Sequence, residues 1–179
     1  MPRSITMHAF LCFAATLALC LLPLTAPFSF AAPQAAAQSQ ITGTLQFGNP
    51  DVQQMVPAGD RPDHSLGVAQ RKGTWTKVND IGGDKSKEGT STETDDVVGN
   101  RIRARGVHVT TMESGDKYFV AFQGTGTLKD GVLQSEMGTW NFTGGTGKLA
   151  HITGKGTFTC APSGDGTACN IEGTYQLAK

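Results

Sequence analysis

Histidine and acidic side chains are the groups of this 179-residue chain that are best suited to proton transfer or metal binding. Beyond the apolar N-terminal segment the histidines are His64, His108 and His151, and none stands at metal-ligand spacing from another histidine or a cysteine. We therefore expect no metal site and no cofactor. The segment 60–64, DRPDH, could form a local acid–base cluster, but we favour a solvated turn with internal ion pairs.

His108 is the first candidate for a catalytic or ligand-orienting group. It shares one face of a strand-like segment, 101–112, with isoleucine, alanine and glycine, whereas Arg101, Arg103 and Arg105 alternate on the other face. If the apolar face points into a cavity, His108 could orient a ligand or move a proton, but even then we favour a core histidine bonded to a backbone carbonyl over a catalytic one. The reverse orientation would bring three arginines inside and indicate an anionic ligand. We favour the first orientation, because buried guanidinium groups need paired acids.

Glu136 is the second candidate for an acid or base. In the segment 132–142 it falls on the same alternation as Trp140, so an inward face would give a cavity carboxylate with a raised pKa. An outward face would leave the carboxylate in solvent, and the sequence leaves both orientations open. The aromatic side chains that we expect either to contact a ligand together with His108 or to fill the core are Trp75, Tyr118, Phe122 and Trp140.

Cys160 and Cys169 are expected to form a disulfide. Both lie on the apolar face of alternating segments, 151–160 and 169–177, at the two ends of a predicted loop over 161–168. A bridge at this position would close a hairpin and stabilise the fold by about 2.5–3 kcal/mol.

Short strand-like segments recur along the chain and predict an all-β domain. They cover 41–47, 68–78, 86–94, 101–112, 117–128, 132–142, 151–160 and 169–177. Many contain Gly-Thr followed by a large apolar residue, a combination that suits a curved sheet. The Asp-Gly pair at 130–131 predicts a tight hairpin. Eight such strands close a small antiparallel barrel that encloses side chains or one small ligand.

Residues 48–67 contain three prolines and show no periodicity, so we expect a long loop of the kind that often forms a lid or a binding surface.

The segment GGTGK at 144–148 looks like a phosphate-binding loop but lacks its essential parts. Such a loop needs a glycine five positions before Gly147, where Phe142 stands, and a hydroxyl residue after the lysine, where Leu149 stands. The sequence therefore predicts a structural β-turn, made by Gly144, Gly145, Thr146 and Gly147.

With the preceding WNFT and the following glycine-rich strand, this turn resembles the signature of the allene oxide cyclase and dirigent barrel superfamily. The resemblance is strongest over 117–160, and it is closest to small exported bacterial members of unassigned activity. It implies an eight-stranded, calycin-like antiparallel barrel with an apolar cavity, often assembled as a homo-oligomer. Plant members of the superfamily steer the cyclisation or coupling of reactive hydrophobic intermediates. Their catalytic residues do not align with positions of this sequence.

The N-terminus is typical of a secretory signal peptide. Arg3 precedes an apolar stretch that is too short for a confident membrane span, and small residues place cleavage after Ala31 or Ala37. An uncleaved anchor is the alternative. We expect a signal peptide over 1–31, a flexible linker over 32–40 and a barrel domain over 41–179, in a secreted or periplasmic protein where a disulfide is stable.

The balance of acidic and basic residues indicates which classes of partner can be expected. The chain has 15 Lys and Arg against 15 Asp and Glu, which gives no electrostatic basis for binding nucleic acid.

These features lead to three hypotheses about function. The first is a barrel that binds a small hydrophobic or amphipathic ligand without turnover. The second is an envelope or structural interaction protein with a packed barrel, in which residues 48–67 would matter most. The third is a cyclase- or isomerase-type enzyme that uses His108 or Glu136 as an acid or base.

Overall fold

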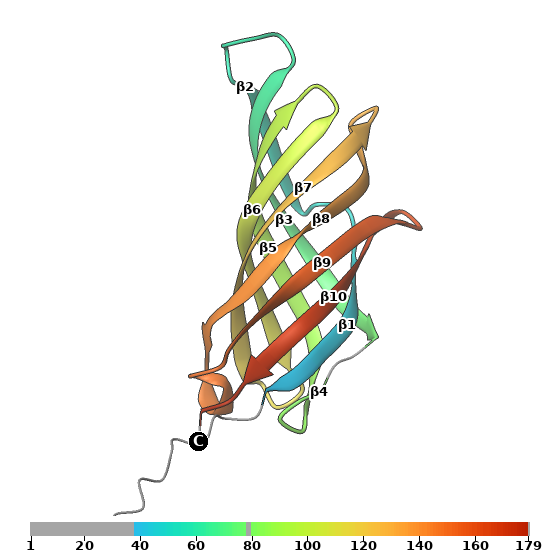
Figure 1. Ribbon diagram of the computed structural model, residues 1–179. Helices are drawn as coiled ribbons and strands as arrows, with labels where there is room; N and C mark the ends of the chain where they lie inside the picture. Colours follow the sequence, from blue (N-terminus) through green and yellow to red (C-terminus); the bar gives the residue numbers. More distant parts are fainter. Residues whose placement is uncertain (1–37, 78–79, 179) are drawn as a thin grey trace, which may run out of the picture. The chain divides into compact units, whose positions relative to one another are not determined.

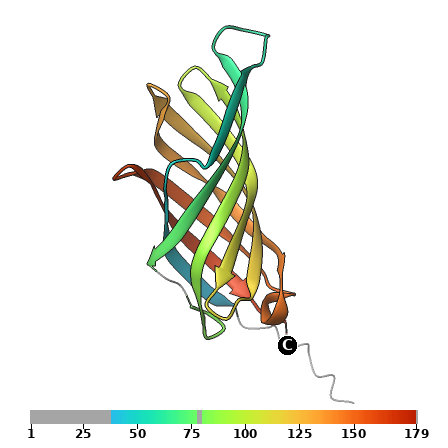
Figure 2. The same ribbon diagram turned by 180° about the vertical axis from the view of Figure 1, so that it is seen from behind.

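The computed structural model describes residues 38–77 and 80–178, which form an antiparallel sheet closed into a barrel (Figure 1, Figure 2). The strands are β1 (Ser39–Phe47), β2 (Val52–Pro57), β3 (His64–Lys77), β4 (Asp80–Ile81), β5 (Asp84–Val98), β6 (Arg101–Met112), β7 (Lys117–Lys129), β8 (Val132–Gly145), β9 (Thr153–Ser163) and β10 (Gly166–Gln176). One turn of 3-10 helix, η1 (Gly147–Leu149), follows β8. Among these residues no helix is long and apolar enough to cross a membrane.

Eight of the strands form the barrel wall, which confirms the predicted fold class. Their order around the wall is β1, β3, β5, β6, β7, β8, β9 and β10, and β10 pairs with β1 to close the ring. Each neighbouring pair is antiparallel, and the eight segments predicted from alternation correspond to these eight strands. The alternation succeeds because a closed sheet buries one face of every strand.

Two boundaries differ from the sequence-based prediction, and a third region is not described by the structure. The predicted signal peptide and residues 32–37 of the predicted linker lie outside the described residues. The last two linker positions, 39 and 40, belong to β1, because they pair with Tyr175 and Thr174 of β10. The long loop predicted over 48–67 is wrong, since it contains β2 and the first residues of β3. β3 continues beyond the end of β1, and its free edge is taken up by β2.

The two ends of the barrel are built differently. At one end, Ile81 of β4 and Leu149 and Ile152 of the β8–β9 connection are almost fully buried. At the other end β8 pairs with β9 only from Glu136 onward, and β2 pairs with β3 beyond the β9–β10 hairpin (Figure 1). The wall is therefore interrupted between β2 and the start of β8, and this end is open.

Glycine residues let large rings lie against the inner wall. A Cβ atom built on Gly156 or Gly173 would lie within 2.6 Å of Trp140 Cζ2, and one on Gly138 would lie 2.6 Å from the ring of Phe158. A methyl group at these positions would displace the rings. The recurring Gly-Thr-aromatic unit is thus a packing device, in which the aromatic side chain of one strand covers a glycine of its neighbour.

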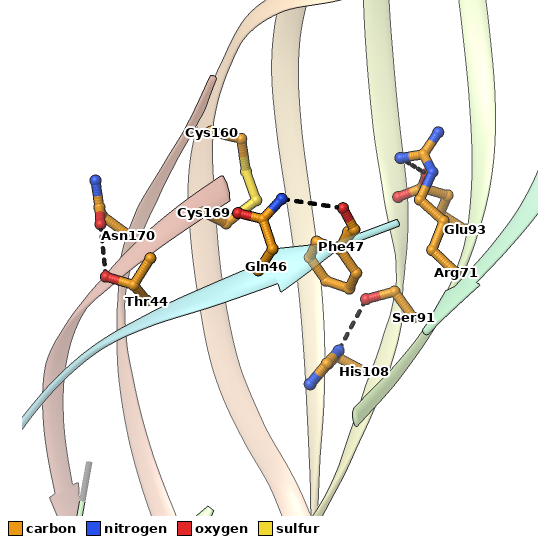
Figure 3. The surroundings of a disulfide bond; sticks show 10 residues. All are labelled: Thr44, Gln46, Phe47, Arg71, Ser91, Glu93, His108, Cys160, Cys169 and Asn170. Atoms are coloured by element: carbon orange, nitrogen blue, oxygen red, sulfur yellow. Dashed lines mark hydrogen bonds and ion pairs between the residues drawn. A yellow bond between two sulfur atoms is a disulfide. The ribbon is translucent and has the colours of Figure 1, made fainter. Parts of the chain in front are cut away.

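The disulfide prediction is confirmed: Cys160 and Cys169 are bonded, with their Cα atoms 4.0 Å apart (Figure 3). They are directly paired residues of β9 and β10, and both are buried. The loop predicted over 161–168 is wrong, because both strands continue past the cysteines and leave a two-residue turn. The predicted Asp-Gly hairpin is confirmed by positive φ angles at Asp130 and Gly131.

The GGTGK segment ends a strand and begins a single helical turn. Gly144 and Gly145 complete β8, and η1 starts at Gly147, so the predicted β-turn is replaced by a 3-10 turn. Thr146 fixes this corner, because its hydroxyl accepts a hydrogen bond of 2.8 Å from the N–H of Lys117. The N–H of Lys148 donates to Asp116 rather than being free for a phosphate.

Candidate functional site

The barrel encloses an apolar chamber of about 90 Å³. The four aromatic residues singled out from the sequence, Trp75, Tyr118, Phe122 and Trp140, all line it. Neighbouring rings meet edge to face, as between Phe122 and Phe158, which leaves ring edges and faces toward the chamber. The volume is smaller than that of an engineered cavity of about 150 Å³ that takes up benzene. The chamber can therefore hold a short alkyl chain.

The two tryptophans differ in how their indole nitrogens are satisfied. Trp140 Nε1 donates a hydrogen bond of 3.1 Å to the carbonyl oxygen of Thr157. Trp75 Nε1 is buried and has no hydrogen-bond partner. A buried donor without a partner is costly, so this group is available to an acceptor atom of a bound molecule.

His108 lies on the inner face of β6, as predicted, and the three arginines of this strand are exposed. Its Nδ1 atom lies 2.8 Å from the hydroxyl of Ser91 (Figure 3), and its Nε2 atom lies 2.9 Å from the hydroxyl of Thr110. Burial lowers the pKa of His108 to about 4, so the imidazole is neutral at physiological pH. Both nitrogens are engaged by hydroxyl groups, which is the arrangement of a structural histidine rather than of a free base.

A group of charged side chains lies between the chamber and the open end of the barrel. Arg71 of β3 and Glu93 of β5 form an ion pair, with Nη1 and Oε1 2.8 Å apart (Figure 3). Asp95 of β5 and Glu136 of β8 lie close enough to influence the same charges. Glu93, Asp95 and Glu136 are all at least nine-tenths buried. We call these four residues the carboxylate cluster. Of the two orientations left open for Glu136, the structure has the inward one.

The carboxylate cluster contains more negative charge than it can neutralise. Burial raises the pKa of Glu136 to about 7, and repulsion from Glu93 adds to this effect. Burial also raises the pKa values of Glu93 and Asp95, although Arg71 opposes the rise in both. The buried atoms Oε1 of Glu136 and Oδ1 of Asp95 have no hydrogen-bond partner. The cluster thus offers unpaired acceptor atoms inside the protein.

The open end of the barrel leads to this cluster. A second cavity, of about 210 Å³, is lined there by Gln53 and Met55 of β2 and by aliphatic residues of β5 to β8. We call it the mouth. Arg71, Glu93 and Glu136 line both the mouth and the chamber. The carboxylate cluster therefore stands where the mouth meets the apolar chamber.

Sequence reasoning missed Arg71, Glu93 and Asp95. Arg71 lies four residues before Trp75 on the same strand, and this spacing puts both side chains on one face. In β5 both faces are polar, as in TETDD at 92–96, so a polar face had to point inward once the barrel closed. The two polar faces of this strand are visible in the sequence. They indicate buried charged residues only when it is known that β5 lies within the barrel wall.

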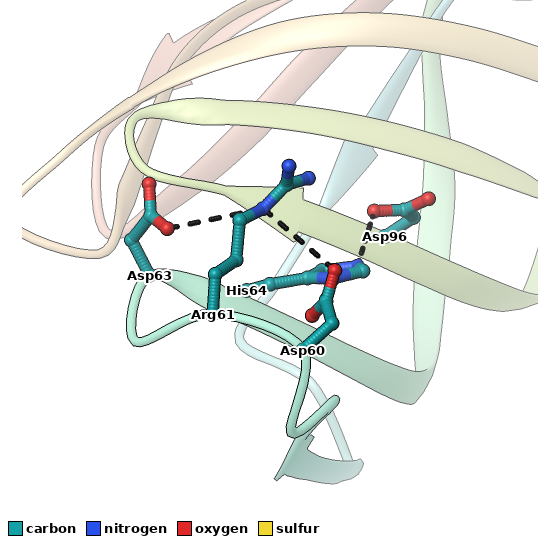
Figure 4. Close-up of polar contacts among 5 residues, drawn as sticks. All are labelled: Asp60, Arg61, Asp63, His64 and Asp96. Atoms are coloured by element: carbon teal, nitrogen blue, oxygen red, sulfur yellow. Dashed lines mark hydrogen bonds and ion pairs between the residues drawn. The ribbon is translucent and has the colours of Figure 1, made fainter.

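The segment 60–64 forms an ion-pair cluster at the surface (Figure 4). Asp60 Oδ1 lies 2.6 Å from His64 Nδ1, and Asp96 Oδ1 lies 3.1 Å from His64 Nε2. Arg61 is within 4.0 Å of Asp60 and Asp63. These contacts tie the β2–β3 connection to β5, which agrees with a turn stabilised by internal ion pairs. In the part of the chain that the structure describes, no group of three or more His, Cys, Asp or Glu residues is arranged to hold a metal ion.

Comparison with known proteins gives similarity in fold. No family model and no curated protein matches the sequence. The solved structures similar to this chain include a protein of unknown function from the DUF3224 family of Shewanella oneidensis MR-1, at 12% identity and a TM-score of 0.43, covering 80% of this chain and 99% of that chain. They also include the pterocarpan synthase dirigent protein GePTS1, at 10% identity and a TM-score of 0.45, covering 92% of this chain and 100% of that chain. A dirigent protein is thus among the structures that the barrel resembles.

Proposed function

We propose that this protein is an exported β-barrel that binds a small hydrophobic or amphipathic molecule in its chamber, without turnover. The observation that carries the proposal is the continuity of the apolar chamber with the mouth through shared lining residues, among them the charged side chains of Arg71, Glu93 and Glu136. Binding sites for small molecules are mostly apolar concavities with a few polar groups that fix orientation. The unpaired atoms of Trp75, Asp95 and Glu136 are polar groups of this kind. The Cys160–Cys169 disulfide supports export, because such bonds persist in oxidising compartments.

The proposal is tested by filling the chamber. Val120 lines it and is buried, whereas Val107 on the neighbouring strand β6 is about half exposed on the outer face. The two variants Val120→Phe and Val107→Phe add the same side-chain volume inside and outside the barrel. Purified protein is stripped with organic solvent, refolding is verified by circular dichroism, and an organic extract of the host is added back. A molecule that binds the folded state raises its melting temperature.

We expect the extract to raise the melting temperature of the parent protein and of Val107→Phe, and to leave that of folded Val120→Phe unchanged. An equal response from the two variants would place binding outside the chamber. No response from the parent protein would contradict the proposed function.

A second candidate is an enzyme of the cyclase or isomerase type with Glu136 as its acid or base. The observation that favours it is the pKa of about 7 together with the unpaired Oε1 atom, since a group that exchanges protons near neutral pH suits acid–base catalysis. The variant Glu136→Gln would abolish such turnover while leaving the fold intact. Turnover that survives this substitution would exclude Glu136 from the chemistry.

A further inference from the structure

The carboxylate cluster holds three carboxylates and one cation, Arg71. Among the described residues that line the chamber and the mouth, the charged side chains are Arg71, Glu93, Asp95 and Glu136, with His108 held neutral between two hydroxyl groups. Arg71 is already paired with Glu93. Asp95 and Glu136 therefore have no cationic partner of their own within the barrel. A buried carboxylate without a partner must either take up a proton or receive a cation from outside.

The unpaired oxygen of Glu136 belongs to a residue that lines both the mouth and the aromatic chamber. A Cβ atom on Gly124 would lie 2.5 Å from Glu136 Oε1 and 2.8 Å from Phe158 Cζ, so the carboxylate and the ring flank the same glycine. The Oε1 atom is fully buried and accepts no hydrogen bond from the protein. A molecule entering from the mouth would meet this oxygen before the rings of the chamber.

We propose that the carboxylate cluster is the subsite for the ammonium group of a small amphipathic amine whose apolar part occupies the chamber. This inference rests on the proposed function, because it names the class of ligand that the chamber would take. The ammonium N–H groups donate to the free oxygens of Glu136 and Asp95, and the positive charge offsets the excess of carboxylates over Arg71. The chamber volume limits the apolar part to a short chain.

The inference is tested with a pair of probes of equal shape. 3-Methylbutylamine and 3-methylbutan-1-ol share the same branched chain and differ in whether the head group is cationic or neutral. The chain has two tryptophans, and both line the chamber, so their indole N–H signals in ¹H–¹⁵N NMR spectra report occupancy directly. Each probe is titrated at pH 8 against stripped protein, against Glu136→Gln and against Glu88→Gln, whose carboxylate is exposed on β5.

We expect the amine to bind the parent protein and Glu88→Gln at least about tenfold more tightly than the alcohol, because a charge-assisted hydrogen bond replaces a neutral one. In Glu136→Gln the two probes should bind with nearly equal affinity. Asp95→Asn provides a second variant, and it should reduce the same preference.

Three results would overturn the inference, and they differ in what they leave standing. Equal binding of both probes to the parent protein would retain the ligand chamber and remove the ammonium subsite. A preference for the amine that persists in both Glu136→Gln and Asp95→Asn would place the cation elsewhere. If neither probe shifts the indole signals, the inference fails together with the chamber as a site for molecules of this size.

Discussion

Arg71 Nη1 lies 2.8 Å from Glu93 Oε1, and this ion pair joins β3 to β5 inside the barrel. The two residues are not directly opposite in the strand register, since Arg71 pairs with Ser91 and Glu93 with Ala69. The guanidinium group therefore reaches diagonally along the inner wall. This guanidinium group supplies the positive charge next to the three buried carboxylates Glu93, Asp95 and Glu136. The stability of the open end of the barrel therefore depends on Arg71.

Removal of the Arg71 charge is expected to destabilise the protein strongly. Arg71→Met would leave Glu93 buried without a partner, and breaking a buried pair in this way costs about 3–5 kcal/mol. The loss should be largest near pH 8 and smaller near pH 5, where the carboxylates can take up protons. Urea denaturation at both pH values measures it. Arg105→Met, on the exposed face of β6, is the matched control and should change the free energy of unfolding by less than about 0.5 kcal/mol.

Glu136 is expected to make the protein less stable as the pH rises. Its pKa goes from an ordinary value of 4.5 to about 7 on folding, so between these values the folded state holds more protons than the unfolded state. The stabilisation is therefore complete below pH 4.5 and is lost as the pH rises through 7, with a total on the order of 3 kcal/mol.

Glu136→Gln should flatten this part of the pH dependence and should exceed the parent protein in stability at pH 8. Free energies of unfolding measured between pH 4.5 and 8.5 test the prediction, with Glu88→Gln as the control. A profile for Glu136→Gln that runs parallel to that of the parent protein would show that Glu136 does not carry the effect.

The disulfide is expected to stabilise the β9–β10 hairpin. Replacing both cysteines by alanine, Cys160→Ala with Cys169→Ala, removes a bond that closes a short loop, and we expect a loss of about 2.5–3 kcal/mol. The parent protein in excess reductant should show the same loss, because the same constraint is absent. Equal urea midpoints for the parent protein and the double variant would mean that strand pairing alone fixes the hairpin.

The packing of Trp140 over glycine is expected to be intolerant of a methyl group. A Cβ atom on Gly173 would lie 2.5 Å from both Trp140 Cζ2 and the carbonyl oxygen of Lys155, so Gly173→Ala should cost about 1–3 kcal/mol. Gly48→Ala is the control, since nothing lies within 4 Å of its Cβ position. Combining Gly173→Ala with Trp140→Phe should recover part of the loss, and strict additivity of the two changes would show that the ring is not the obstacle.

The fold could be predicted from the sequence because the barrel buries one face of every wall strand. Alternation in β6, together with the cost of burying three arginines, placed His108 inside and Arg103 outside, and alternation in β9 and β10 placed Cys160 and Cys169 on the same buried face. β2 could not be predicted, because all six of its residues are exposed. Its sequence therefore shows no alternation of apolar and polar residues that would separate it from a loop. β2 lies where it does because it pairs with the free edge of β3. That edge exists only in the folded barrel, so the sequence of β2 does not reveal it.

The candidate site could be predicted only in its apolar half. The four aromatic residues of the chamber stand out by type, but the carboxylate cluster does not, because acidic residues in a strand normally indicate a solvent-facing side. Glu93 and Asp95 are inside because they pair directly with the buried residues Ala69 of β3 and Ala104 of β6, and directly paired residues point to the same face of a sheet. The orientation of Glu136 is fixed in the same way by its pairing with Gly126 and Cys160.

The most direct test of a ligand-binding barrel is native mass spectrometry of the protein purified from its own host, before and after gentle organic extraction. We predict a discrete additional mass on the unextracted protein. This mass should disappear on extraction and should be absent from Val120→Phe. The same spectra count the subunits of any homo-oligomer. Ligand binding in the chamber would be contradicted by two results together: a single, unmodified mass before extraction, and no response of the two indole signals to the host extract.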